Sequence, residues 1–156
     1  MGGTTRVALG GTFEIVHKGH QALLMRAFGL GDEVLIGLTS DDLASHGRTR
    51  RVAPYAEREW ALRSFLDRTF PGLDYEIRRI NDEFGPAVDL EDLDVLVVSE
   101  NTHPTGLRIN EERERRGLRP LRLVTIPHVL ADDGRPISST RILAGECDAE
   151  GRVLSS

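Results

Sequence analysis

The sequence predicts a single α/β domain in which a five-stranded parallel sheet carries helices on both faces. Short apolar runs alternate with segments whose apolar residues recur at helical spacing, and this alternation continues from residue 6 to residue 143. Alternating strands and helices favour a parallel sheet that is covered on both sides. The length of 156 residues, with no internal repeat or linker-like segment, fits one domain with one core. We therefore expect one Rossmann-like domain over residues 1–156.

Five segments have the composition of strands. The first, second and fourth are short apolar runs, which are typical of strands buried on both faces of a parallel sheet. The third alternates imperfectly between apolar and polar residues, as a partly exposed strand would. The expected strands are Val7–Leu9, Glu33–Leu38, Asp74–Ile80, Asp94–Ser99 and Leu121–Ile126.

Helical patterns fill the intervals between these strands. A first helix follows the turn after the first strand, and a short second helix is capped by residues 39–42 and runs to about His46. Pro54 starts a third helix, whose apolar side is expected to comprise Trp60, Ala61, Phe65 and Leu66. Two further helices are expected, at Thr105–Arg116 and Ser138–Leu143, and residues 146–156 are expected to form a frayed tail.

Composition excludes several classes of protein. The net charge of −5 lacks the basic footprint of a nucleic-acid-binding domain. No apolar run approaches the length of a membrane span, and the N-terminal residues lack a signal-peptide pattern. The single cysteine, Cys147, cannot form an internal disulfide and is compatible with the cytosol. We expect a cytoplasmic protein that binds neither nucleic acid nor membrane.

The turn after the first strand carries the strongest functional signal. Gly10 and Gly11 lack a Cβ, so the backbone there can approach a ligand closely. At the start of the following helix, N–H groups without intrahelical partners favour an anion. His17 and His20 are three residues apart and can share one side of the first helical turn. Together with the hydroxyl of Thr12, these groups suit a polyphosphate.

Two other interpretations of this turn are open. The glycines could form an ordinary turn beside two surface histidines, or the histidines could bind zinc. The remaining histidines, His46, His103 and His128, are scattered, so no third zinc ligand is evident. The chain contains neither a G-x-x-x-x-G-K-[ST] loop nor a G-x-G-x-x-G fingerprint. Any nucleotide chemistry must therefore use the histidine-rich turn.

Two motifs resemble the signatures of the nucleotidyltransferase superfamily that carries H-x-G-H. The first is Gly10-Gly11-Thr12-Phe13 followed by His17-Lys18-Gly19-His20, with Glu14 where that family usually has Asp. The second is Ile137-Ser138-Ser139-Thr140, which by itself is also compatible with simple helix capping. Two signatures in the same order as in the family, over a hundred residues apart, reinforce each other.

The resemblance implies a role for each residue of the two motifs. Thr12 would hydrogen-bond the acceptor phosphate or the α-phosphate of ATP. His20 would donate a hydrogen bond to the α- or β-phosphate, and His17 would contact the leaving pyrophosphate. The turn itself would be shaped by Gly10, Gly11 and Phe13, and the β- and γ-phosphates would be bound by Ser138, Ser139 and Thr140.

The middle of the chain resembles a narrower family. Asn81–Ala87, Val97–Thr102 and Gly106–Arg113 are similar to the archaeal phosphopantetheine adenylyltransferases and to a domain of eukaryotic coenzyme A synthase. This resemblance implies that the nucleotide lies beside Ser99, Glu100 and Thr102. It also implies that the substrate contacts Asn110 and Arg113, for which a solvated helix face is the alternative.

Residues 47–51 form a basic, glycine-led segment that predicts a loop. In the family, the segment after the second strand supplies a basic residue, commonly lysine, to the acceptor phosphate. Only arginines are present here, and a guanidinium can bind a phosphate bidentately. We favour Arg50 for this role, with Arg48 as a second contact, and a solvated charge run as the alternative.

The resemblance as a whole implies an enzyme that transfers the adenylyl group of ATP to 4′-phosphopantetheine. The products would be dephospho-coenzyme A and pyrophosphate, and Mg²⁺ would arrive with ATP, without a protein ligand that the sequence identifies. The resemblance also favours a monomer. One alternative is a related transferase that uses FMN, nicotinamide mononucleotide or glycerol-3-phosphate. Another is a nucleotide-binding sensor without catalysis.

Overall fold

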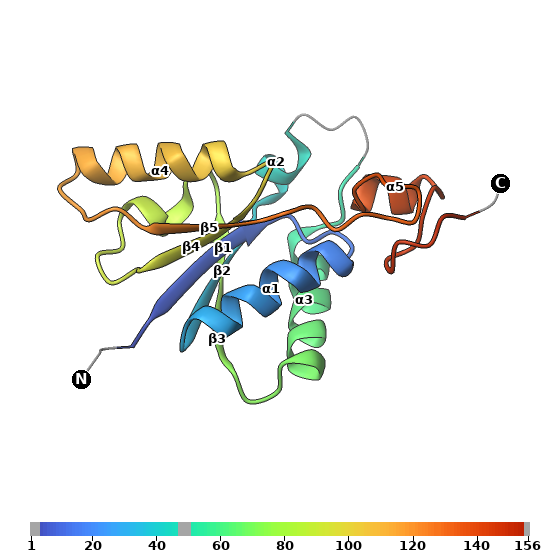
Figure 1. The fold of residues 1–156 in the computed structure, drawn as a ribbon, viewed down its shortest axis with the longest axis horizontal. Helices are drawn as coiled ribbons and strands as arrows, with labels where there is room; N and C mark the ends of the chain where they lie inside the picture. The colour runs from blue at the N-terminus through green and yellow to red at the C-terminus, as the bar shows by residue number, and fades with distance from the viewer. Residues whose placement is uncertain (1–3, 47–50, 155–156) are drawn as a thin grey trace.

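The structure is a computed structural model that describes residues 4–46 and 51–154. It contains a five-stranded sheet in the order β3-β2-β1-β4-β5, and every neighbouring pair is parallel (Figure 1). The strands are β1 (Arg6–Gly11), β2 (Glu33–Thr39), β3 (Asp74–Ile80), β4 (Val95–Ser99) and β5 (Arg122–Ile126). The predicted five-stranded parallel sheet is confirmed, with strand boundaries shifted by at most two residues.

Helices cover both faces of the sheet. The bounds are α1 (Lys18–Leu30), α2 (Asp41–Ser45), α3 (Tyr55–Thr69), a 3-10 turn η1 (Gly85–Val88), α4 (His103–Arg115) and α5 (Ser139–Leu143). The packing partners show that α1 and α3 lie on one face, whereas α4 and η1 lie on the other. No helix in the described part of the chain is long and apolar enough to cross a membrane.

Alternation along the strands divides the apolar side chains between two clusters. Val7 and Leu9 of β1 pack with α1 and α3, whereas Ala8 between them packs with α4 and η1. The same division holds in β2, where Ile36 faces the first cluster and Leu35 the second. Both faces are therefore buried, which explains why these strands appear in the sequence as apolar runs.

The strand order reverses at β1 and β4. β1 pairs with β4 only at Val7–Val95 and Ala8–Leu96, although β1 itself continues to Gly11. The helix after β1, α1, packs on one face of the sheet, and the helix after β4, α4, packs on the other. An open parallel sheet binds ligands where the order reverses, outside the carboxyl ends of the strands. The separation of β1 and β4 puts such an opening here.

The apolar side of α3 differs from the prediction. Trp60 was expected to be buried, but it is 72% exposed, and the inward stripe is formed instead by Arg58, Leu62, Phe65 and Leu66. Residues 58, 62, 65 and 66 recur at the helical spacing, which turns position 60 toward solvent. The prediction ranked Trp60 by hydrophobicity, whereas the periodicity of the helix decides its position.

The expected frayed tail is also wrong, at least for residues 146–154. Cys147 is fully buried with Ala131 and Ile137 in a small apolar cluster beside α5. The backbone N–H of Lys18, at the start of α1, donates to the carbonyl of Ala149 at 2.9 Å. An N–H in the first turn of a helix has no intrahelical partner, so the tail supplies the acceptor that α1 needs.

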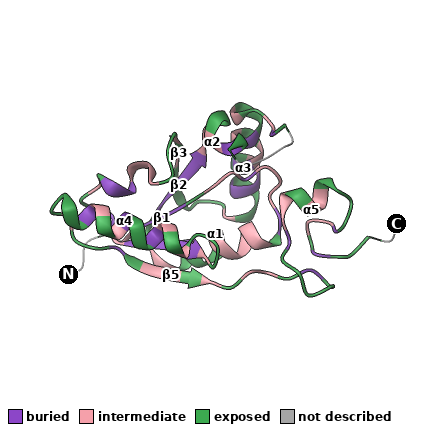
Figure 2. Cartoon of the chain, turned by 90° about the horizontal axis from the view of Figure 1, so that it is seen from above, coloured by how far each residue is buried: buried purple, intermediate pink, exposed green. Residues whose placement is uncertain are grey.

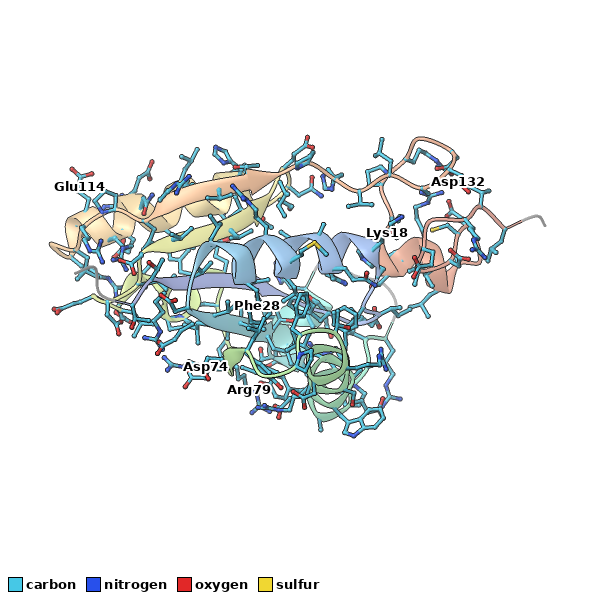
Figure 3. The ribbon with its side chains drawn as sticks, turned by 60° about the horizontal axis from the view of Figure 1, so that its bottom comes forward. Lys18, Phe28, Asp74, Arg79, Glu114 and Asp132 are labelled. Carbon is cyan, nitrogen blue, oxygen red and sulfur yellow. The ribbon has the colours of Figure 1, made fainter. Side chains whose placement is uncertain are left out.

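The segment that contains α5 and the tail stands apart from the sheet (Figure 1). Its surface is mostly exposed or intermediate, whereas the central strands β1, β2 and β4 are largely buried (Figure 2). Figure 3 shows Lys18 at the end of α1 that meets this segment, and Asp132 in the outlying part of the segment itself. The carboxyl-terminal segment thus lies next to the start of α1.

Candidate active site

The turn after β1 contains a residue with an unusual backbone conformation. Phe13 has a positive φ of 46°, and its ring is 1% exposed. A Cβ on Gly11 would lie 3.0 Å from that ring, so glycine leaves the space that the ring occupies. The Phe13 ring lies 4.7 Å from the ring of His20, measured between centroids. Gly11 and Phe13 therefore support the position of His20.

The two histidines of the H-x-G-H motif cap α1 reciprocally. Nδ1 of His17 accepts the N–H of Gly19 at 3.0 Å, and Nδ1 of His20 accepts the N–H of His17 at 3.3 Å. Their rings stack with centroids 3.9 Å apart. A Cβ on Gly19 would lie 2.9 Å from the His17 ring, which explains the glycine between them. The spacing of the motif is thus required by the cap.

Both histidines are uncharged at neutral pH. Burial lowers the pKa of His17 to about 4. Burial, reinforced by the charge of His17 and opposed by the Ile15 carbonyl, lowers the pKa of His20 to about 3. Because each Nδ1 accepts a backbone N–H, the hydrogen of each neutral ring belongs on Nε2. The site therefore contains two neutral imidazole rings, and the Ile15 carbonyl lies within hydrogen-bonding reach of the His20 ring.

The second motif begins α5 and is tied directly to the first. The hydroxyl of Ser138 caps α5 by accepting the N–H of Arg141 at 3.1 Å, so its own hydrogen remains able to donate. The hydroxyl of Ser139 accepts the N–H of Ile15 at 3.2 Å and donates to the Ile15 carbonyl at 3.3 Å. These residues are 124 positions apart. Ser139 therefore joins the two motifs.

The two motifs line one pocket of about 320 Å³, which we name the polar pocket. It is lined by Thr12, Phe13, Glu14, His17, Gly19, His20, Leu23, Ser99, Asn101, Thr102, Ile126, Pro127, His128, Val129, Ile137, Ser138, Ser139 and Thr140. The structure thus brings together most of the residues that the sequence analysis selected. It adds residues 126–129, which could have been found because they lie at the carboxyl end of the last strand of a parallel sheet.

A second cavity of about 270 Å³, which we name the apolar pocket, opens where β1 and β4 separate. Its walls are β1, β2, β4, α4 and the segment after β3. Gly10 and Gly11 line this pocket rather than the polar one, and Thr102 lines both. The two pockets therefore meet at the carboxyl end of β4. The lining residues include Leu9, Leu35, Ile80, Phe84, Pro86, Leu96, Val98 and Ile109.

A buried arginine that the sequence analysis did not select lies behind the turn. Arg58 of α3 is 1% exposed, and its Nη1 donates to the Thr12 carbonyl at 3.1 Å and to Oγ1 of Thr39 at 3.2 Å. Glu14 connects the same regions, because its Oε2 accepts the N–H of Ala53 at 3.3 Å. No sequence pattern distinguished Arg58 from the exposed arginines of α3, since its burial depends on the tertiary structure.

The residues after β4 hold one another in place. The N–H of Ser99 donates to the hydroxyl of Thr102 at 2.9 Å. Glu100 is exposed and does not line the polar pocket, but its carboxylate accepts the N–H of His128 at 3.0 Å. Glu100 therefore connects the loops after β4 and β5 beside the pocket, and Ser99 and Thr102 form part of its wall.

The structure places Asn110 and Arg113, two predicted substrate contacts, away from both pockets. The side-chain NH₂ of Asn110 donates to the Leu121 carbonyl at 2.9 Å, and its side-chain oxygen accepts the Leu121 N–H at 2.8 Å. Arg113 is fully buried, and its guanidinium donates to the carbonyls of Ala87, Leu90 and Arg119. Neither residue lines either pocket. The polar sequence of α4 suggested a solvated face, but both side chains instead fasten backbone segments under that helix.

Two predicted residues, Arg48 and Arg50, lie outside the residues that the structure describes. The neighbouring described residues bracket their attachment points. Leu43 of α2, before the segment, lines the apolar pocket. Ala53, after the segment, bonds Glu14 of the turn. These two described residues reach the pockets, Leu43 directly and Ala53 through Glu14.

Hydroxyl and neutral imidazole donors converge at the switch point of a doubly wound parallel sheet. Open α/β sheets bind ligands at this point, and a helix N-terminus there favours an anionic group. The chain belongs to the cytidylyltransferase-like family, whose pattern it matches over residues 8–145. The family resemblance expected from the two motifs is confirmed.

Individual relatives agree with this assignment. The chain is 44% identical to a phosphopantetheine adenylyltransferase of Methanosarcina acetivorans, over 95% of each chain. It is 43% identical to one of Methanopyrus kandleri, over 92% of this chain and 90% of that protein. Among solved structures, a protein of unknown function from Archaeoglobus fulgidus is 38% identical, with a TM-score of 0.72 over 78% of this chain and 89% of that one.

Proposed function

We propose that this protein transfers the adenylyl group of ATP to 4′-phosphopantetheine in coenzyme A biosynthesis, giving dephospho-coenzyme A and pyrophosphate. The observation that carries the proposal is the polar pocket, in which neutral imidazole and hydroxyl donors from both motifs converge. The choice of acceptor is supported by the names of the archaeal relatives at 42–44% identity.

ATP would lie in the polar pocket. Its phosphates would meet the hydroxyls of Ser138 and Thr140 and the rings of the two motif histidines, all of which line that pocket. The nucleoside would extend along Ser99, Asn101 and Thr102 and along residues 126–129, at the carboxyl ends of β4 and β5. Ser139 would act mainly by holding the two motifs together, because its hydroxyl already bonds both backbone groups of Ile15.

The arm of phosphopantetheine would occupy the apolar pocket. This arm carries a branched apolar carbon and two amides, which fit walls of aliphatic side chains interrupted by hydroxyls such as Thr102 and Thr105. Its phosphate would then lie near Thr12, which lines the polar pocket directly after Gly10 and Gly11 of the apolar pocket. We retain Arg50, with Arg48, as the residues that would hold this phosphate.

The reaction would be an in-line displacement. An oxygen of the acceptor phosphate forms a bond to the α-phosphorus, and the bond from that phosphorus to the bridging oxygen breaks. Pyrophosphate leaves with the electron pair. The acceptor phosphate is already an anion, so the site needs no strong base, and catalysis comes from positioning and from donors aimed at developing charge. His20 would donate to the α-phosphate and His17 to the leaving pyrophosphate.

Mg²⁺ would enter as part of the nucleotide substrate. Within residues 4–46 and 51–154, no three His, Cys, Asp or Glu side chains are grouped so that they could hold a metal ion. The polar pocket instead offers hydroxyls and imidazoles, a set that fits an ion held chiefly by phosphate oxygens and water. When bound, the ion supplies positive charge that stabilises the leaving pyrophosphate.

The test is pyrophosphate release with ATP and Mg²⁺ against four acceptors: phosphopantetheine, FMN, nicotinamide mononucleotide and glycerol-3-phosphate. We expect turnover with phosphopantetheine alone. Turnover with a different acceptor would retain the transferase and reject the acceptor. ATP binding without pyrophosphate release from any acceptor would indicate a sensor and reject the proposal.

Replacing Phe84 tests the assignment of the apolar pocket to the acceptor. Phe84→Ser should raise KM for phosphopantetheine about tenfold, because it removes apolar surface from the pocket wall. The KM for ATP should stay within about twofold. Leu107→Ser is the matched control, since Leu107 is 49% exposed on α4 and does not line the pocket. Equal effects of the two substitutions on KM would contradict the assignment.

A further inference from the structure

We propose that Arg58 and Thr39 are positioning residues that hold the Thr12 hydroxyl as a hydrogen-bond donor toward the reacting phosphate. The inference rests on the proposed function and extends it to two residues that never touch the substrate phosphate. It comes from the direction of each hydrogen bond in a short chain, which runs from Arg58 through Thr39 to Thr12.

Arg58 is fixed by its surroundings. Within the described residues, its guanidinium donates to the Ala53 carbonyl at 2.7 Å, the Thr12 carbonyl at 3.1 Å, Thr39 Oγ1 at 3.2 Å and Asp41 at 3.0 Å. The side chain has no exposed surface. A guanidinium with this many directed bonds has a single orientation available, so its donor to Thr39 is held in place.

The direction of the chain follows from what each group is able to do. A guanidinium only donates, so Oγ1 of Thr39 must accept from Arg58. Thr39 in turn donates its one hydroxyl hydrogen to Oγ1 of Thr12 at 3.1 Å. Thr12 is therefore an acceptor on that side, and its own hydrogen is left to point elsewhere.

The chain crosses from one pocket to the other. Thr39 ends β2 and lines the apolar pocket, whereas Thr12 lines the polar pocket. The hydrogen of Thr12 thus becomes available where the acceptor phosphate would meet the α-phosphorus. Without the bond from Thr39, the Thr12 hydroxyl could rotate and donate to a protein oxygen instead. The hydrogen-bond chain from Arg58 through Thr39 keeps the Thr12 hydroxyl oriented before the substrates bind.

Asp41 connects Arg58 to the backbone at the start of α3. Its Oδ1 accepts from Nη2 of Arg58 and also from the N–H of Tyr55 at 2.8 Å. Asp41 starts α2 and Tyr55 starts α3, so these bonds join the starts of the two helices. The arginine that orients Thr12 is therefore anchored to both α2 and α3.

The experiment is a double-mutant cycle on kcat. Thr39→Val keeps the shape of the side chain and removes its hydroxyl, and it should lower kcat about tenfold with little change in KM for ATP. Thr39→Ser, which restores the hydroxyl, should recover most of kcat. In the Thr12→Ala background, Thr39→Val should have no further effect, because Thr39 acts through Thr12. Thermal unfolding of each variant verifies that the fold is intact.

Each other outcome rejects the inference. If Thr39→Val slows the Thr12→Ala variant by the same factor as it slows the wild type, the two residues act independently. If Thr39→Ser is as slow as Thr39→Val, shape rather than the hydroxyl matters. An active wild type with an unaffected Thr39→Val variant would overturn this inference alone. A wild type that turns over no acceptor would overturn the proposed function and this inference together.

Discussion

The polar pocket has two walls that are supported in different ways. The first wall, Thr12–His20, rests on the main core: Phe13 packs there beside Leu24 of α1. The second wall, Ser138–Thr140, belongs to the outlying segment, whose own buried cluster contains Ala131, Ile137 and Cys147. The first wall therefore inherits the rigidity of the sheet, whereas the second depends on a much smaller apolar cluster.

Ionic contacts compensate for the small cluster behind the second wall. Arg141 of α5 is 12% exposed at its side chain and pairs with Asp133 and Glu146. It also donates to the carbonyls of Arg135 and Pro136, immediately before the second motif. On the proposed function, the first wall would supply fixed donors to the reacting phosphates. The second wall would hold the outer phosphates through a fastened loop, so we expect it to govern ATP affinity.

The largest expected effect is on the first wall. His20→Ala should lower kcat at least about a hundredfold, because it removes a positioned donor at the reacting centre. KM for ATP should change much less, since the outer phosphates keep the second wall. Steady-state kinetics measure both constants. His46→Ala, at an exposed position after α2, serves as the control. A normal kcat for His20→Ala would remove His20 from its proposed role.

Arg113 lies outside both walls, so its replacement should affect stability but not catalysis. Arg113→Met should lower the free energy of unfolding by about 2 kcal/mol, because buried carbonyls of Ala87, Leu90 and Arg119 lose their donor. The kcat of the folded enzyme should not change. Urea unfolding and kinetics test the two statements. Arg116→Met is the matched control, since its ion pairs with Asp89 and Glu112 lie at the surface. A selective rise in KM would restore Arg113 as a substrate contact.

The second wall is tested at Arg141. Arg141→Met should raise KM for ATP about tenfold while kcat stays within about twofold. The reason is that two backbone carbonyls before Ser138, those of Arg135 and Pro136, lose their donor. Arg135→Met is the matched control: Arg135 pairs with the same two carboxylates but is 65% exposed. If both variants weaken ATP binding equally, the carboxylate contacts rather than the carbonyl contacts support this wall.

The smallest effect is a pH dependence that belongs to the first wall. His17 and His20 have folded pKa values of about 4 and about 3, below the 6.5 expected when unfolded. The unfolded chain therefore binds more protons below pH 6.5, so stability falls as the pH falls through this range. The loss should be roughly 0.7 kcal/mol per histidine between pH 7 and pH 6.

Urea unfolding of the wild type and His20→Asn at pH 7, 6 and 5 measures this contribution. The variant should lose less stability than the wild type as the pH falls, and His46→Asn should match the wild type. Identical slopes for all three proteins would show that burial of His20 does not stabilise its neutral form. Separately, kcat should show no inflection from either histidine between pH 6 and pH 8.

The sequence predicted the sheet well because strand and helix patterns are local properties. The segment Asp74–Ile80 was placed without error, and the start of the last helix differs by a single residue. Errors arose where burial depends on distant contacts. Trp60 was judged by its hydrophobicity, and Arg113 was taken from the family resemblance although it is fully buried. The tail was judged by its composition, although its Ala149 carbonyl caps α1.

The sequence by itself determined the chemistry of the site. The spacing of His17, Gly19 and His20 follows from a helix cap that is formed within four residues, so it is visible in the motif. Only the tertiary structure decided which groups meet across the chain: Ser139 with Ile15, and Arg58 with Thr12 through Thr39. The reason is physical. Local hydrogen bonds depend on neighbouring residues, whereas long-range contacts and burial depend on how the two faces of the sheet pack.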